Sequence, residues 1–291
     1  MRISKEDTIY VMDKANKAVA KAKSGDRVVF ETCDCFHDSI KTEEDTISGI
    51  NFDHVNPATG PLYIEGAEVG DVLKVDILRI DIAKQGVEVA APGMGRIPDR
   101  ITKEETVICE IKDGYANFKG LQIPLNKMIG VIGTAPEGEG IPTGAPHDHG
   151  GNLDCTMIKE GVSLYLPVNV KGGLLAMGDL HGAMGDGEIM GAGLEVAGEV
   201  EVLVTVLKDF NYELPLIETQ DKWITLGSRK TLEEASDLAI NNMVDLILDK
   251  TDLSVNHAGM LLSMAGNLRV CQIVDPNMTM RMELEKKYVG D

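Results

Sequence analysis

The sequence predicts a β-rich protein, with packed antiparallel sheets arranged as a sandwich or barrel and a smaller C-terminal α+β layer. Apolar and polar residues alternate in many short segments before residue 210, as in residues 199–208 (EVEVLVTVLK), and Gly-rich turns connect these segments. Helical spacing is clear only after residue 230. We therefore expect a β-rich body at residues 1–210, which carries the loops of the functional site, and an α+β part at residues 211–291.

The body begins with two segments of different character. Residues 7–24 (DTIYVMDKANKAVAKAKS) are rich in Ala and Lys, which favours a helix by intrinsic propensity. From Arg27 the pattern changes to the alternation of a strand, which ends in DCFHDSI. Asp34 lies where this strand ends, a position at which rigid scaffolds commonly display functional carboxylates.

The next strands carry two local signals. In residues 72–82 (VLKVDILRIDI), apolar residues occupy odd positions up to Ile77 and even positions from Leu78, and this phase switch indicates a β-bulge. Asp113 and Gly114 separate TVICEI from YANF, which predicts a hairpin with a D-G turn. Other expected strands cover residues 62–65, 128–134, 162–170 and 174–181.

The C-terminal part has clear helix signals. Thr231 followed by Glu234 forms a capping box before the helical pattern of residues 232–250. A second helix is expected from Ser254 to near Gly266, followed by strands in LRVCQIVD and TMRMELE. Because no linker precedes this part, we expect it to pack on the body and not to fold independently.

Composition excludes several classes of protein. The 291 residues include 47 acidic and 28 basic ones, and the formal net charge of -19 repels nucleic acid and anionic membranes. No apolar run has the roughly 18 residues of a membrane helix, and the first residues lack an apolar signal region, which predicts a cytoplasmic protein. Five cysteines without an export signal favour reduced thiols, and Cys33 and Cys35 are interpreted as structural thiols.

Candidate functional residues concentrate between Gly133 and Glu199. They occur as pairs two residues apart, followed by one further acid: His147 and His149, Asn152 and Asp154, Asp179 and His181, Asp186 and Glu188, then Glu195. Residues two apart in extended backbone point to the same face, so each pair could aim both groups at one site. Imidazole and carboxylate together are ligands that suit zinc or a similar divalent ion.

Several of these segments resemble the acetamidase/formamidase family of amide hydrolases. The likeness extends from about Asp26 to Pro276 and keeps the family order. The segments that carry it are GDRVVFETCDCF, NPATGPLYIEGAEVGDVLKV, LNKMIGVIGTAP, HGGNLD, VSLYLPVNV, GDLHGAMGDGE and LRVCQIVDP. Relatives have extended backbone before the first strand, so the resemblance opposes a helix at residues 7–24 and leaves that segment open.

The resemblance implies a hydrolase that cleaves the C–N bond of short linear amides, such as formamide and acetamide, to carboxylate and ammonia. The implied metal ligands are Asp34, His149, Asp179 and His181, and the implied catalytic residues are Asn152, Asp154, Glu188 and Glu195. Glu188 or Glu195 would move the proton, and Asn152 would stabilise the oxyanion. Zinc is the first expectation and calcium the alternative, because oxygen donors outnumber histidines. Some of the carboxylates could instead orient the histidines. Relatives form oligomers, so a homo-oligomer, a dimer or higher, is expected.

Two alternatives remain at this point. Cys155, six residues after His149, or Ser163 could serve as a nucleophile, although neither lies in a G-x-S-x-G elbow. A β module that binds a metal or small ligand without catalysis would also explain the pairs of Asp and His. His37, His54 and His257 are interpreted as solvated or core side chains.

Overall fold

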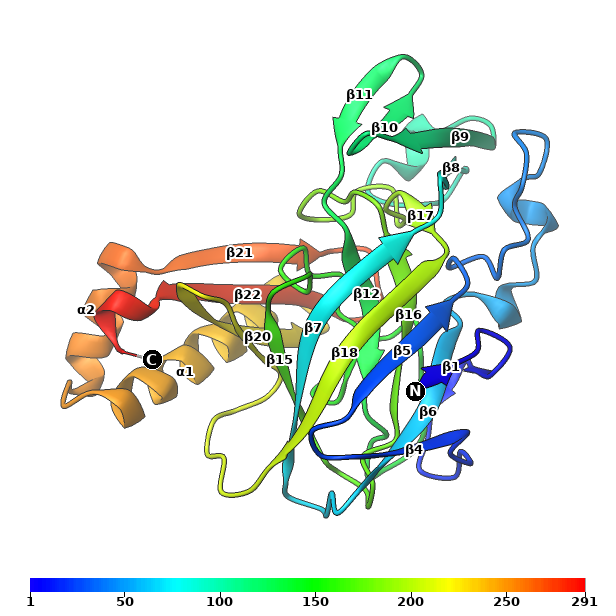
Figure 1. Cartoon of the computed structure of the whole chain (residues 1–291). Coiled ribbons are helices and arrows are strands. Elements are labelled where there is room, and N and C mark those ends of the chain that lie inside the picture. The colour runs from blue at the N-terminus through cyan, green and yellow to red at the C-terminus, as the bar shows by residue number, and fades with distance from the viewer. Residues whose placement is uncertain (291) are drawn as a thin grey trace.

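The computed structural model describes residues 1–290, which form two large sheets, one two-stranded sheet and two α-helices (Figure 1). The nine-stranded sheet contains, in spatial order, β1 (Arg2–Ile3), β5 (Arg27–Thr32), β18 (Gly198–Leu207), β7 (Val72–Ile82), β15 (Ser163–Pro167), β19 (Leu216–Glu218), β20 (Lys222–Arg229), β22 (Met278–Glu285) and β21 (Asn267–Gln272).

The eleven-stranded sheet has a main path and a branch. The path contains β11 (Leu121–Pro124), β10 (Tyr115–Phe118), β9 (Glu105–Lys112), β8 (Gln85–Ala90), β17 (Glu195–Val196), β16 (Leu175–His181), β12 (Met128–Gly133) and β14 (Gly150–Asn152). The branch contains β6 (Ala58–Glu65), which pairs with β16, together with β2 (Thr8–Ile9) and β4 (Ala20–Lys23). The small sheet pairs β3 (Val11–Met12) with β13 (Ile141–Pro142), and 3₁₀ turns occur at Ile47–Gly49, Phe52–His54, Pro98–Arg100 and Lys286–Tyr288.

The main hydrophobic core draws side chains from both large sheets. Phe30 of β5 and Val75 of β7 belong to the same buried cluster as Leu62 of β6 and Ile132 of β12. Most strand pairs are antiparallel, and β1 with β5 and β4 with β6 are the parallel exceptions within residues 1–290. The predicted β-rich class of packed antiparallel sheets is therefore confirmed. Neither α-helix of the described chain is both long and apolar enough to cross a membrane.

The predicted bulge in β7 is present. Arg79 and Ile77 pair with consecutive residues of β18, so Leu78 lies between two paired residues without a partner of its own. Leu78 is exposed, whereas Ile77 and Ile80 are buried. The extra residue thus lets both halves of the strand direct apolar side chains to the core.

The helix favoured by propensity at residues 7–24 is wrong, and the extended alternative is correct. Short strands occupy this segment, and β4 runs parallel to β6, with Ala22 buried beside Ile64 of that strand. Tertiary pairing with a strand some forty residues away outweighs the weak helical preference of Ala and Lys.

The C-terminal part extends the nine-stranded sheet and covers it with helices. α1 (Leu232–Lys250) begins after Thr231, whose side chain accepts the N–H of Glu234, and α2 (Val255–Ala265) begins after Ser254. Figure 1 shows both helices beside β20 and β22, and α1 contributes to a second apolar cluster with Trp223 and Leu284. The predicted α+β layer is confirmed, while the boundary at residue 210 stays a prediction.

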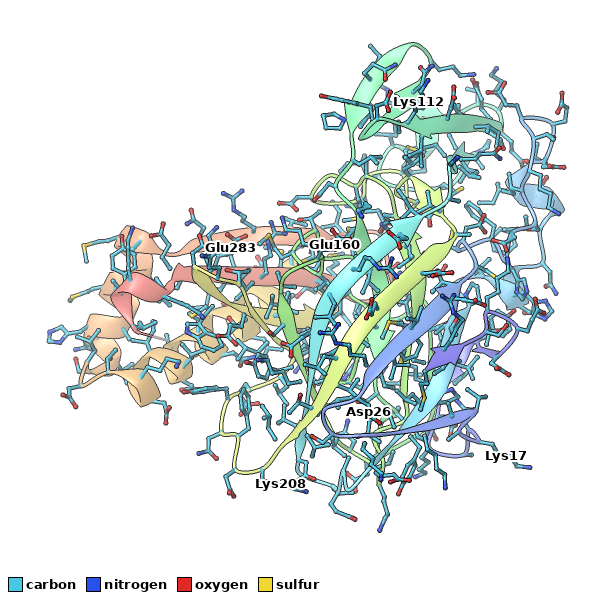
Figure 2. The ribbon with its side chains drawn as sticks, viewed as in Figure 1. Lys17, Asp26, Lys112, Glu160, Lys208 and Glu283 are labelled. Carbon is cyan, nitrogen blue, oxygen red and sulfur yellow. The ribbon has the colours of Figure 1, made fainter. Side chains whose placement is uncertain are left out.

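The hairpin of β9 and β10 projects at the opposite end of the molecule from β4 (Figure 1). Its turn residues Asp113 and Gly114 both have positive φ, 52° and 84°, as the expected D-G turn requires. Lys112, labelled in Figure 2, marks this hairpin, and Glu283 in the same view marks the C-terminal sheet. The candidate site lies on strands between these two regions.

Candidate active site

Neighbouring strands of the eleven-stranded sheet carry the candidate residues. Asn152 ends β14, Asp179 and His181 lie at the end of β16, and Glu195 begins β17. His181 is directly opposite Glu195 in the ladder of β16 and β17. Because opposed residues of neighbouring strands share a face, the sheet places this imidazole against this carboxylate.

Three acidic residues of this region have unusual backbone. Asp154, Asp179 and Glu188 have φ values of 38°, 55° and 47°, in the left-handed region that non-glycine residues rarely adopt. Gly130 on β12 faces two of them, because a methyl group on its Cα would lie 2.5 Å from Asp154 Oδ1 and 2.5 Å from Asp179 Oδ2. Only glycine therefore leaves room for both carboxylates to converge on this strand.

The converging side chains form two groups of potential metal ligands. In each group the three donor atoms lie within 4.8 Å of one another; the first contains Asp154, His181 and Glu188, and the second contains Cys35, Asp179 and Glu195. His181 Nε2 lies 3.1 Å from Glu195 Oε1, 3.6 Å from Asp179 Oδ1 and 3.9 Å from Asp154 Oδ1. One imidazole nitrogen thus faces both groups, so they belong to one buried centre.

Polar atoms without partners gather at the predicted site residues. Within residues 1–290, the buried side-chain nitrogen and oxygen atoms that lack a hydrogen bond are both ring nitrogens of His149 and of His181, both carboxylate oxygens of Asp154, Asn152 Oδ1 and Glu195 Oε2. The contact of His181 with Glu195 has the distance of an ion pair but not the angles of a hydrogen bond. A buried polar group without a partner costs about 1–3 kcal/mol. Such a concentration indicates that these atoms are arranged to bind something other than each other.

The centre is strongly acidic and contains no strong base. Burial and the charges of Glu188 and Asp179 raise the pKa of Asp154 well above its usual value, and burial also raises the pKa of Glu188. Burial raises the pKa of Glu195 to about 7. Burial alone would lower the pKa of His181, but Glu195 and Asp179 raise it well above normal. Asp154, Asp179 and Glu195 form ion pairs with His181, and in the described chain none of these three carboxylates pairs with a Lys or Arg.

These observations fit a bound cation. Carboxylate and imidazole donors suit divalent ions, and a positive ion would offset the repulsion among the acids. The buried His, Asp and Glu groups could therefore hold a metal. Their chemistry alone does not select one metal, since zinc and calcium both accept carboxylate oxygens.

Glu195 is held in a defined orientation. The N–H of Gly193 donates to Glu195 Oε1 at 2.9 Å, which leaves Oε2 without a partner in the described chain. A methyl group on Gly193 would lie 2.7 Å from His181 Nδ1, so glycine is needed for the loop to pass the ring. The arrangement keeps one carboxylate oxygen engaged and the other available.

Asp34 lies close to the centre without joining either ligand group. It follows β5, and its Oδ1 accepts the N–H groups of Phe36 at 3.0 Å and Asp38 at 2.8 Å. Burial raises the pKa of Asp34 to about 6, with contributions from the charges of Asp38 and Asp179. Its carboxylate thus shapes the loop that carries Cys35.

His149 is buried but belongs to neither ligand group of the described residues. Burial lowers the pKa of His149 to about 4, so its ring is neutral at pH 7 and both nitrogens lack partners. Asn152 donates to Asp275 Oδ2 at 3.0 Å, which uses one of its two N–H donors.

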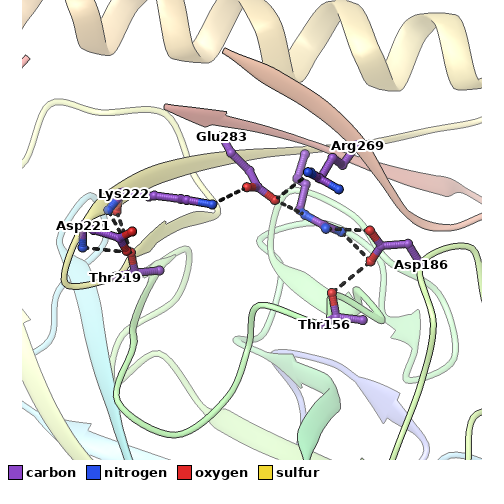
Figure 3. Close-up of polar contacts among 8 residues, drawn as sticks. Thr156, Asp186, Thr219, Asp221, Lys222, Arg269 and Glu283 are labelled. Carbon is purple, nitrogen blue, oxygen red and sulfur yellow. Dashed lines mark hydrogen bonds and ion pairs between the residues drawn. The ribbon is translucent and has the colours of Figure 1, made fainter. Parts of the chain in front are cut away.

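The expectation that each pair faces one site holds for Asp179 and His181 but is wrong for two other pairs. His147 is exposed while His149 is buried, and these residues flank a tight turn. Asp186 turns away from Glu188, because Gly187 and Glu188 have positive φ and the segment is not extended. Asp186 instead accepts two hydrogen bonds from Arg281 and one from Thr156, and Figure 3 shows the contact with Thr156.

Three residues of the centre were missed by the sequence patterns. Cys35, interpreted as a structural thiol, offers a ligand atom beside Asp179 and Glu195. Asp275 binds Asn152, and burial together with Asp154 raises its pKa well above normal. The signals available were the position of Cys35 next to Asp34 and the place of Asp275 in the family-like segment LRVCQIVDP.

Glu88 is the third missed residue. Burial raises its pKa to about 8, and Glu195 adds to this effect. It lies in β8, the strand that pairs with β17 opposite Glu195. Nothing in the ordinary alternation of QGVEVA distinguishes this carboxyl.

The alternative nucleophile Cys155 is fully buried within the main core. Burial would raise its pKa, but a hydrogen bond with Cys271 and the charge of Arg281 lower it. Cys155 also does not line the large pocket beside the β9–β11 region that is described below. His37, His54 and His257 are exposed, and the first two contact Tyr10.

The fold and the buried centre define a β-rich protein with an acidic, histidine-containing site suited to a cation. A model described as the Acetamidase/Formamidase family matches residues 14–140 and 137–287. The chain belongs to this family, as its sequence motifs predicted.

Characterised relatives and solved structures support this assignment. Formamidase from Methylophilus methylotrophus is 28% identical over 251 residues, which cover 66% of this chain and 62% of that protein. Acetamidase from Mycolicibacterium smegmatis is 25% identical over 215 residues, 52% of this chain and 53% of that protein. The chain thus spans between about half and three fifths of the length of these curated relatives.

Two crystal structures match almost the whole fold. Acetamidase from Bacillus halodurans has 49% identity and a TM-score of 0.97, with 99% of this chain and 98% of that chain covered. A predicted acetamidase/formamidase from Thermoanaerobacter tengcongensis has 41% identity and a TM-score of 0.96, with 99% and 96% covered.

Proposed function

We propose that this protein is an amidase that hydrolyses the C–N bond of short linear amides, such as formamide and acetamide. Water adds to the carbonyl carbon, the C–N bond breaks, and the products are a carboxylic acid and ammonia. Family membership and the similarity to proteins named acetamidase and formamidase support this activity. The observation that carries it is the buried centre whose partnerless polar atoms face one another.

We further propose a divalent ion at the centre, with zinc as the first choice and calcium as the alternative. Asp179 and His181 are proposed ligands, and Asp154 and Glu188 are proposed as additional ligands because they share a group of donor atoms with His181, to which neither His149 nor Asp34 belongs. When bound, such an ion would polarise the amide carbonyl and lower the pKa of a water molecule.

Glu195 is the proposed proton carrier. Its Oε1 is fixed by Gly193, so its free Oε2 can take a proton from water and deliver it to the amide nitrogen. This delivery is required because an amide nitrogen leaves as neutral ammonia. Glu188 would take this role if it were not a ligand.

The remaining residues would stabilise the oxyanion and position the loop and the substrate. Asn152 has one N–H left after binding Asp275, and this donor could stabilise the developing oxyanion by roughly 3 kcal/mol. Asp34 would hold its loop in place, and neutral His149 would offer an acceptor or donor to the substrate.

The test is ammonia release from formamide and acetamide by chelator-treated protein, before and after separate additions of zinc and calcium. We expect activity to be lost on chelation and restored by one ion, with bound metal measured in the same samples. Full activity in verified metal-free protein would refute the metal mechanism. Cys155→Ser is the matched variant for the nucleophile alternative and should retain activity. The absence of ammonia release from any amide would favour a binding module.

A further inference from the structure

A large pocket lies between the β9–β11 region and the Gly-rich loop that follows β16. Its volume is about 510 Å³. Phe118 and Ile123 line it from the hairpin strands, while Met184, Ile189 and Leu194 line it from the loop. Most of the lining is apolar, although Glu88, Asn126, Asp186 and Glu188 also contribute.

The pocket adjoins the candidate active site directly. Glu188 lines the pocket and also belongs to a group of potential metal ligands. Gly193 lines it as well, and the N–H of Gly193 holds Glu195. A molecule in the pocket would therefore contact Glu188, a potential metal ligand, and Gly193, which orients Glu195.

The size of the pocket does not match a minimal amide. The acyl part of formamide is a single hydrogen and that of acetamide a methyl group, whereas pockets of about 300–1,000 Å³ typically enclose drug-sized ligands. An apolar wall gains affinity from apolar groups that it removes from water. Formamide and acetamide would leave most of this wall without contact.

The charges of the lining residues also limit which acyl groups the pocket can accept. None of its residues is Lys or Arg, so the lining offers no positive partner to a substrate that carries a carboxylate. Arg281 lies next to the lining residue Asp186, but its charge is already neutralised by that carboxylate. Neutral amides with apolar acyl groups fit both the shape and the charge.

We propose that the pocket is the acyl-binding site and that this enzyme prefers neutral primary amides with an extended apolar acyl group. This inference rests on the proposed amidase function and names its substrate class. Hexanamide and phenylacetamide represent the class, because each carries an amide at one end and a flexible chain or a ring at the other. The amide would lie at the buried centre and the acyl group against the hairpin.

The test compares kcat/KM for ammonia release from acetamide, butyramide, hexanamide, phenylacetamide and the anionic succinamate, using the metal-containing enzyme. We expect kcat/KM for hexanamide to exceed that for acetamide by roughly tenfold or more, since one methylene in an apolar pocket discriminates about 10- to 200-fold. Succinamate should be the poorest substrate. A maximum at acetamide would overturn the inference and leave the amidase function intact, while inactivity on every amide would refute the function itself.

Two substitutions on one strand assign the preference to the pocket. Ile123 of β11 lines the pocket, and Leu121 of the same strand does not; both side chains are exposed, by 37% and 61%. Ile123→Asp should lower kcat/KM for hexanamide at least tenfold more than kcat/KM for acetamide. Leu121→Asp, which adds the same charge to the same strand, should change neither.

Retained acetamide activity reports that the Ile123→Asp variant is folded. If it loses that activity, Ile123→Ala provides the same comparison without a new charge, and a selective loss on hexanamide is again expected. Equal effects of the substitutions at positions 121 and 123 would overturn the assignment of the pocket.

Discussion

Two groups of charged side chains differ in how their charges are balanced. In the C-terminal sheet, Arg281 donates to Asp186 at 2.9 and 2.7 Å and to Glu283 at 2.8 Å. Lys222 donates to the second oxygen of Glu283 at 2.9 Å, and Thr156 donates to Asp186 at 2.9 Å. Each acid in this network faces a cation or a donor.

The centre around His181 has the opposite balance. Asp154, Asp179, Glu188 and Glu195 surround one imidazole, and neither oxygen of Asp154 has a hydrogen-bond partner in the described chain. Burying charge costs free energy unless the charge is paired. The C-terminal network is therefore balanced by its own cations, whereas the centre leaves acidic groups unbalanced, which is the arrangement that the proposed cation would need.

This difference also explains how the two regions are connected. Asp186 and Glu188 are two residues apart, yet one belongs to the balanced network and the other to the unbalanced centre. The Gly-rich loop is therefore anchored by Arg281 at one point and presents Glu188 at the next. Substitutions in the centre and in the C-terminal network should therefore affect activity and stability differently.

The largest change is expected in activity when the centre loses its proton carrier. Glu195→Gln keeps the size of the side chain and the bond from Gly193 but cannot take a proton, so kcat should fall about 10²- to 10⁴-fold. Steady-state ammonia release measures it. Glu199→Gln, a matched change outside the centre at a residue that pairs with Arg2, should leave kcat unchanged. If Glu195→Gln were nearly as active as the wild type, the role would pass to Glu188.

The next largest effect is on the free energy of unfolding, which should fall after a substitution in the C-terminal network but not after one in the centre. Arg281→Met removes the hydrogen bonds to Asp186 and Glu283 while Lys222 stays beside Glu283, so the free energy of unfolding should fall by about 1.5–3 kcal/mol. In chelator-treated protein, Asp154→Asn removes an unbalanced buried charge and should leave stability unchanged or increase it. Urea unfolding with an unchanged m-value measures both. Equal destabilisation by the two variants would contradict the comparison.

Much of the fold could be predicted because its signals are local. The phase switch before Leu78, the capping box at Thr231 and the turn at Asp113 each depend on a few adjacent residues. Residues 7–24 could not be predicted from propensity, because their conformation depends on pairing with β6. Register between distant strands is a tertiary property that no short pattern contains.

The site shows the same limit. Asp179 and His181 face each other as predicted, although Asp179 has a φ of 55° within β16. Glu188 left the alternation because its backbone is left-handed. Gly130 and Cys35 could not be assigned from their own segments, since their importance comes from the carboxylates that other strands place against them.

The smallest effect that we expect is an opposite dependence of stability on pH in the two regions. Burial alone would raise the pKa of Glu283, but hydrogen bonds from Arg281 and Lys222 hold this pKa below its usual range. Glu283 therefore stabilises the fold above the unfolded value of about 4.3, and this contribution is lost as pH falls through the lower folded value. The pKa of Asp154 is raised, so metal-free protein loses stability as pH rises above the unfolded value of about 3.9. Urea unfolding across pH should show that Glu283→Gln flattens the acid side and Asp154→Asn the neutral side. If the two variants had the same dependence of unfolding free energy on pH, the unbalanced charge of Asp154 would not determine the stability of the centre.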